Sequence, residues 1–438
     1  MPPGPLDLTK RSQYVTVDKQ LLLYFKKSSS GIIFPMLLGF LPIAFCRGTR
    51  NPTIAFSFFA LLCLVLNTAP LLFAGKLRRH KCTNRSENPE GGDQEVPKES
   101  DRRHIRGLCV AAFVSNIVLM VTAACLTAVL NISYLYLAAP VVLLIGAPYV
   151  YHIEHSLRNS MVWGVLQYEE LQDDLKYFFD VSSEVTQAAF LGLPAMLFSQ
   201  LRSTNCKLSV QVRAPEVLTM YTVLFGLFTM LVCLVPMGAD FIKARERFVK
   251  VFIRCSSYVL LALIAVVATL AAMEILQGYV VLAFVFMLGA CIWGLFWKEC
   301  RTPRPSEKPS SSPSGGSETG SGRDAVVMRS RSLVWFGFCP AIFGVLMASY
   351  SRSVSDGGAD ISKLYKTCVF FMYVALISNL GRMLLVHEVH EDDGAQDKPS
   401  ILLVSGVVNV CLMAVTVFLV VLMALLQPQQ IQNTFVLA

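Results

Sequence analysis

The sequence predicts an all-α integral membrane protein, a polytopic bundle of about 11 transmembrane helices. Of its 438 residues, 54% are hydrophobic and only 16% are charged, whereas soluble domains carry roughly 25% charged residues. The apolar residues form long runs, and a bilayer core about 30 Å thick needs roughly 20 apolar helical residues to cross it. Because backbone amides find no partner in lipid, each such run is expected to be a helix.

Ten apolar runs are direct candidates for crossings, and the first follows an N-terminal segment, 1–30, that we expect in the cytosol. The ten runs cover residues 31–46, 52–75, 107–130, 132–150, 217–238, 255–275, 279–297, 333–351, 367–386 and 401–426. The run 31–46 is short for a crossing helix. Together these runs account for nearly half of the chain.

An eleventh candidate, TQAAFLGLPAMLFSQL at 186–201, is tested by the distribution of Lys and Arg, which favour the cytoplasmic side. If the N-terminus lies inside and this stretch crosses, inside segments carry 29 basic residues and outside segments carry 8. If it does not cross, the numbers become 22 and 15. We therefore predict that 186–201 crosses. The alternative is a re-entrant half-helix broken at Pro194.

Four segments are predicted to lie outside the bilayer. They are a polar loop at 76–106, an amphipathic acidic cytosolic helix at 151–185, a Pro/Ser/Gly-rich disordered linker at 298–332 and a tail at 427–438. Within 157–180 apolar residues recur at helical spacing, opposite an acidic face. A helix recruited by anionic lipid would be basic. This helix is therefore expected to connect the bundle or to dock a cytosolic protein partner.

The apolar runs also suggest tandem four-helix repeats over 31–150, 186–297 and 333–426, the last lacking its fourth helix. Pro35, Pro194 and Pro340 recur in similar apolar sequence segments. Two tight hairpins, expected to turn at Asn131-Ile132-Ser133 and Leu276-Gln277-Gly278, occupy corresponding places in the first two repeats. Chance similarity between apolar segments is the alternative explanation.

Two H-x-x-H pairs are the candidate metal ligands. His152 and His155 lie in HIEH, and His387 and His390 lie in HEVHEDD. Residues i and i+3 share a helix face, and imidazole suits divalent transition metals. The alternative is solvated histidines at helix ends. We predict no resident cofactor and no catalytic residue.

Polar residues inside apolar runs are the other candidates, because such residues mark function in membranes. Glu274 lies near the outer end of its run, and Arg382 lies about one turn from the inner end of its run and can snorkel to the interface. Asn116 and Asn379 lie deeper and are expected to form hydrogen bonds between helices. Glu274 and Arg382 are candidates for a solute or proton site.

No nucleotide-binding, acyl-transfer or kinase motif occurs. The net charge of +8 does not indicate nucleic acid, because the basic residues flank apolar runs. The sequence therefore predicts a non-enzymatic membrane organiser or partner-docking protein, in the plasma membrane or an internal membrane, that contacts the lipid bilayer and a cytosolic protein at 157–180. The alternative is a channel or carrier for a small or lipophilic solute, and an enzyme using the paired histidines is a third hypothesis.

Overall fold

The fold is that of a computed structural model, and every regular element in its described residues is a helix. It describes residues 21–33, 37, 51–86, 99–143, 172–202, 213–234, 246–283, 285, 340–355, 363–391 and 398–426. The elements are η1 (Ser29–Ile33), α3 (Asn51–Ser86), α4 (Glu99–Leu130), α6 (Gln172–Arg202), α7 (Ala214–Leu234), α9 (Glu246–Leu276), α12 (Pro340–Ser355), α13 (Lys363–Glu391) and α14 (Lys398–Leu426). No strand occurs among these residues. The predicted all-α class is confirmed there.

Among the described residues, five helices are long and apolar enough to cross a bilayer. Their apolar stretches are Ile54–Leu72, Val110–Val129, Ala214–Cys233, Val251–Leu276 and Lys363–Met383, in α3, α4, α7, α9 and α13. Each overlaps one predicted run. Shorter apolar helices, Ser133–Leu143 and Gly406–Leu419, lie within two further runs. Most of the runs 31–46 and 279–297, and the segments 298–332 and 427–438, lie outside the described residues.

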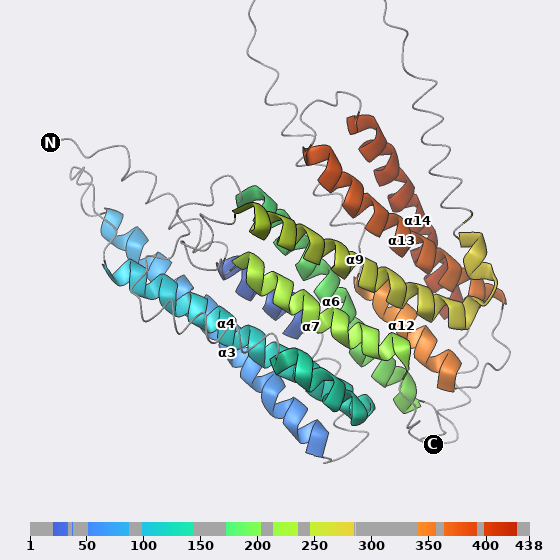
Figure 1. The fold of residues 1–438 in the computed structure, drawn as a ribbon, viewed down its shortest axis with the longest axis horizontal. Helices are drawn as coiled ribbons and strands as arrows, with labels where there is room; N and C mark the ends of the chain where they lie inside the picture. Colours follow the sequence, from blue (N-terminus) through green and yellow to red (C-terminus); the bar gives the residue numbers. More distant parts are fainter. Residues whose placement is uncertain are drawn as a thin grey trace, which may run out of the picture. The chain divides into compact units, whose positions relative to one another are not determined.

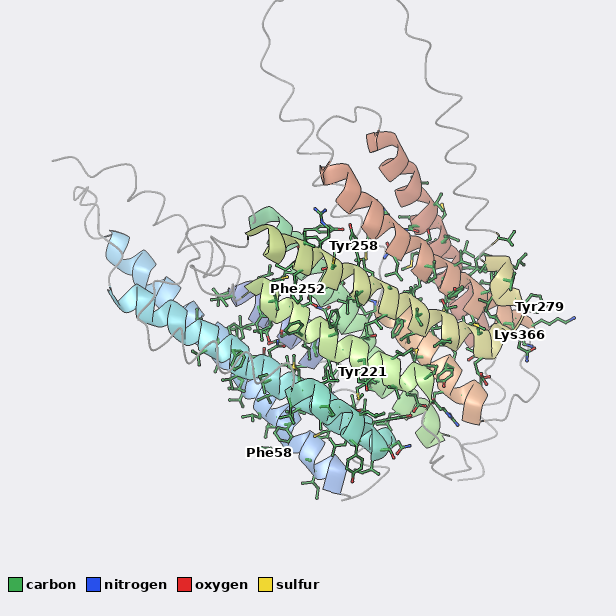
Figure 2. All side chains as sticks on the ribbon, viewed as in Figure 1. Phe58, Tyr221, Phe252, Tyr258, Tyr279 and Lys366 are labelled. Atoms are coloured by element: carbon green, nitrogen blue, oxygen red, sulfur yellow. The ribbon has the colours of Figure 1, made fainter. Side chains whose placement is uncertain are left out.

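The burial pattern of α3 is the inverse of that in a water-soluble protein. Ile54, Phe58, Leu61 and Val65 form one exposed apolar stripe, whereas Asn67 is fully buried. Phe58 points away from the neighbouring helices (Figure 2). Soluble proteins rarely expose contiguous apolar stripes, since water solvates them poorly. A lipid-facing exterior with polar contacts inside explains this arrangement, and we conclude that the chain is a membrane protein.

Residues 1–267 form one compact unit. In it α3 packs against α4, α4 against α7 and α7 against α6, and η1 contacts both α3 and α6 (Figure 1). Interhelical hydrogen bonds join these helices. Asn67 Nδ2 donates to Ser115 Oγ at 2.6 Å, and Asn116 Nδ2 donates to the Leu227 carbonyl at 2.7 Å. Polar side chains therefore link α3 to α4 and α4 to α7.

Two helices of this unit continue beyond their apolar stretches. α3 extends from Leu72 to Ser86, and α4 begins at Glu99, eleven residues before its apolar stretch at Val110. Both ends of the segment 76–106 are thus helical. α6 runs without a break through Pro194. A single helix therefore joins the end of the predicted acidic helix to the predicted crossing 186–201.

Residues 268–438 form the second unit. Here α13 packs against both α12 and α14. Ser378 Oγ donates to Asn409 Oδ1 at 2.6 Å, and Asn409 Nδ2 donates to Asn379 Oδ1 at 3.2 Å. These two bonds join α13 to α14 through buried polar side chains.

A short turn lies at each of the two predicted positions, 131–133 and 276–278. At the first, Ser133 N donates to Asn131 Oδ1 at 3.0 Å, so Asn131 caps the helix that follows the turn. At the second, Gln277 has a φ of 53°, a left-handed conformation that few non-glycine residues adopt.

Candidate functional site

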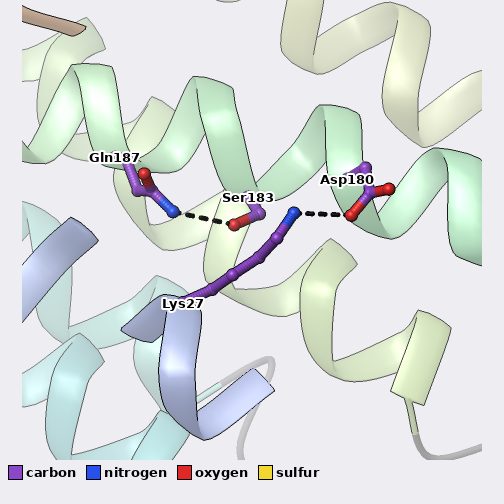
Figure 3. A network of polar contacts seen from close by, with 4 residues as sticks. All are labelled: Lys27, Asp180, Ser183 and Gln187. Carbon is purple, nitrogen blue, oxygen red and sulfur yellow. Dashed lines mark hydrogen bonds and ion pairs between the residues drawn. The ribbon is translucent and has the colours of Figure 1, made fainter. Parts of the chain in front are cut away.

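A buried ion pair in the first unit lies between the helical residues 21–28 and α6. Lys27 Nζ lies 2.5 Å from Asp180 Oδ1, across 153 positions of sequence (Figure 3). The Lys27 side chain is 8% exposed and that of Asp180 is 26% exposed. Two charges held this far from water attract each other more strongly than a surface pair does. This ion pair is the centre of the candidate site.

Aromatic side chains form the apolar wall of the site. The Lys27 ammonium also lies 5.5 Å from the centroid of the Phe179 ring, within range of a cation–π interaction. Tyr24 contacts the same ring, with centroids 6.4 Å apart, and its hydroxyl donates to the Ala112 carbonyl at 3.5 Å. These residues belong to the core that helix 21–28 shares with α4 and α6. The aromatic contacts hold Lys27 on the side facing α6.

One face of α6 supplies the remaining polar groups. Asp180, Ser183, Glu184 and Gln187 follow the spacing i, i+3, i+4 and i+7, which places them on one side of the helix. Gln187 Nε2 donates to Ser183 Oγ at 3.0 Å (Figure 3). The face therefore presents two carboxyl groups, a hydroxyl and an amide, with Lys27 opposite.

Glu184 is the group whose protonation responds most to this environment, and it lies two residues before the predicted crossing 186–201. It is 7% exposed. Burial raises the pKa of its carboxyl to about 7; the positive charge of Lys27 opposes that rise and the negative charge of Asp180 adds to it. A proton on Glu184 can therefore be gained or lost near neutral pH.

Two glycines allow the helices to approach α6 closely. A Cβ on Gly31 of η1 would overlap the side-chain amide of Gln187, and a Cβ on Gly226 of α7 would overlap Thr186 Oγ1. The bond from Thr186 Oγ1 to the Ser182 carbonyl holds the Thr186 side chain in place. The absence of side chains at Gly31 and Gly226 thus lets η1 and α7 approach two consecutive residues of α6, Gln187 and Thr186.

The polar residues predicted from the sequence fall in separate places. Asn116 is buried in the first unit, where it bonds the Leu227 carbonyl. Asn379 and Arg382 are both buried in the second unit, one turn apart on α13. Arg382 is 2% exposed; it lies against Gly406, which has no side chain to exclude it. Glu274 is exposed near the end of α9.

Only one of the two predicted histidine pairs lies in the described residues. His152 and His155 lie outside the described residues, and His387 and His390 lie three residues apart on the backbone of α13. Among the described residues no group of three or more His, Cys, Asp and Glu side chains could hold a metal ion. The metal site at these histidines stays a prediction.

Sequence reasoning missed Lys27, Asp180 and Glu184. The signal was present: D-x-x-S-E-x-x-Q at 180–187 is a polar stripe of helical spacing that runs into an apolar stretch. The predicted boundary between the acidic helix and the crossing falls between residues 185 and 186. It therefore separates Gln187 from the other three residues of the stripe. The partner Lys27 has no comparable local signal, because it lies in a different part of the chain.

Comparison of the chain with protein-family models, with curated proteins and with solved structures finds no match.

Proposed function

We propose that this protein is a polytopic membrane carrier for a small solute, and that Lys27, Asp180 and Glu184 form part of its solute or proton site. The observation that carries the proposal is the ion pair of Lys27 and Asp180 beside Glu184, inside a helical unit with an apolar exterior. Buried ionisable groups are costly, and a buried carboxyl with a raised pKa beside a charged partner is a candidate functional site.

The charges of the site favour a solute that carries an amine or another cation. Two carboxyl groups face one ammonium, so the three groups sum to −1 when Glu184 is ionised and to zero when it is protonated. A cationic group would compete with Lys27 for Asp180, and a proton on Glu184 would weaken the attraction. This gives a physical route by which proton binding and solute binding oppose each other.

The carrier hypothesis is preferred to the organiser hypothesis because of where the acidic segment packs. Phe178 and Phe179 are buried in the core of the first unit, and Asp180 pairs with Lys27. This end of the segment 157–180 is engaged within the protein. Residues 157–171 lie outside the described residues, so docking of a cytosolic partner there stays a prediction.

For the topology we propose 11 crossings with the N-terminus in the cytosol, in tandem four-helix repeats. The concentration of Lys and Arg on one side supports this arrangement. The length of α6 also supports it, since 31 residues span about 46 Å at 1.5 Å each. Accessibility of tags at the two chain ends in intact cells tests it: the arrangement requires tags on opposite sides, and tags on the same side contradict it.

The transport proposal is tested in liposomes that contain the purified protein and a trapped pH-sensitive dye. Small amines, zwitterionic amino acids and carboxylates are added outside, one class at a time. We expect at least one amine-bearing class to drive a proton flux, and K27Q and D180N to abolish it. K26Q is the matched control, since Lys26 is the exposed neighbour of Lys27. No flux with any class, or equal flux in K27Q and the wild type, would contradict the proposal.

A further inference from the structure

The second unit contains a buried cation whose surroundings differ from those of Lys27. Arg382 lies on α13, one residue before the end of the apolar stretch Lys363–Met383, and is 2% exposed. A Cβ on Gly406 of α14 would lie 2.8 Å from Arg382 Nη2 and 3.1 Å from Nη1. The guanidinium group therefore lies directly against α14, at a position where an added Cβ would displace it.

None of the three side-chain nitrogens of Arg382 has a hydrogen-bond partner within the described part of the chain. Arginine does not lose its proton in proteins, so its charge cannot be removed. An uncompensated buried charge is strongly destabilising. An anion against the guanidinium group would offset that cost.

A second donor lies one turn away on the same face of α13. Asn379 Nδ2 is buried and also has no hydrogen-bond partner among the described residues. Its orientation follows from its neighbours: Ser378 donates to Asn409 Oδ1, and Asn409 donates to Asn379 Oδ1. These bonds occupy the acceptor of the Asn379 amide and leave its N–H donors unused. Two independent side chains thus present donors only.

We propose that Arg382 and Asn379, with Gly406 as the floor, form a binding site for a phosphate group. A guanidinium group donates to two oxygens of a phosphate at once, and an amide N–H adds a further donor. The site lies at the end of an apolar stretch, the depth at which lipid headgroups meet a membrane protein. The phosphate can belong to an anionic phospholipid or to a phosphate-bearing solute.

Thermal unfolding of the purified, delipidated full-length protein tests the site with two probes. One is inorganic phosphate, and the other is phosphatidylglycerol in neutral phosphatidylcholine bicelles, compared with phosphatidylcholine alone. We expect at least one probe to raise the Tm of the wild type, because a ligand that binds only the folded state stabilises it. A response to phosphatidylglycerol alone identifies a lipid headgroup, and a response to inorganic phosphate identifies a soluble source.

R382Q should abolish the response, and R352Q, at an exposed arginine of α12, should keep it. If R382Q does not fold, R382K and N379A serve instead; each loses a hydrogen bond to a charged group and should bind the probe about tenfold more weakly. A wild-type protein that responds to neither probe would overturn the proposal. So would a response in R382Q, or in both R382K and N379A, equal to that of the wild type.

Discussion

The ammonium of Lys27 and the carboxylate of Asp180 form an ion pair at 2.5 Å, although 153 positions separate the two residues. The pair fastens helix 21–28 to α6 and sets the position of both relative to Glu184. Lys27 is almost entirely shielded from solvent, so loss of either partner should lower the stability of the fold. Stability is measured by thermal unfolding, separately from transport.

We expect K27M and D180N each to lower the stability of the protein by about 2 kcal/mol, less than a fully buried pair would lose, since Asp180 is partly exposed. The K27M/D180L double variant should regain part of that loss, because neither charge then lacks a partner. The Tm in neutral detergent measures this, with K26M as the control. A double variant as unstable as the sum of the single variants would contradict the pairing.

Stability should depend on pH through Glu184. The folded-state pKa of about 7 lies above the ordinary value of 4.5, so the folded chain binds this proton more tightly than the unfolded chain does. The stabilisation is full below pH 4.5 and is lost as the pH rises through 7. The Tm of the wild type should therefore fall between pH 5 and pH 8 more than that of E184Q. Equal falls in both proteins would show that another group is responsible.

G226A should destabilise the contact of α6 with α7 by about 1–3 kcal/mol, because the new methyl group overlaps Thr186 Oγ1. T186A in the same chain should remove most of that cost. G107A is the control: a Cβ there meets nothing within 4 Å, and alanine favours the helix over glycine by about 1 kcal/mol. The measurement is the Tm of the wild type, G226A, G226A/T186A and G107A. Equal Tm values for G226A and G107A would contradict the overlap.

The hairpin after α9 should be sensitive to the residue at position 277. Gln277 has a φ of 53°, which costs a residue with a Cβ about 1–2 kcal/mol. Q277G should therefore leave the Tm unchanged or raise it, and Q277V should lower it, because a β-branched side chain fits this conformation worst. A Q277V protein as stable as Q277G would show that the turn has a different conformation.

The sequence predicted the features that depend on local pattern. The lengths of the apolar runs predicted α3, α4, α7, α9 and α13. A helix satisfies all the backbone hydrogen bonds of an apolar segment in lipid. The two hairpins followed from short polar interruptions at 131–133 and 276–278. These predictions required no knowledge of which helices are neighbours.

The candidate site required that knowledge. The contact between Lys27 and Asp180 depends on how two distant helices pack, and helical periodicity does not encode it. Arg382 illustrates the same point: its position near the end of a run predicts a side chain that reaches the interface, but Gly406 opens a place for it against α14. Tertiary packing, rather than the composition of either helix, decides where these charges lie.

α3 continues well past Leu72, the end of its apolar stretch. Fourteen further residues to Ser86 extend the helix by about 21 Å along its axis, and α4 returns beside it from Glu99. Helical segments are stiffer than an irregular loop of the same length. The predicted loop 76–106 is therefore helical at both of its described ends, which makes those ends stiffer than the polar loop that the composition predicts.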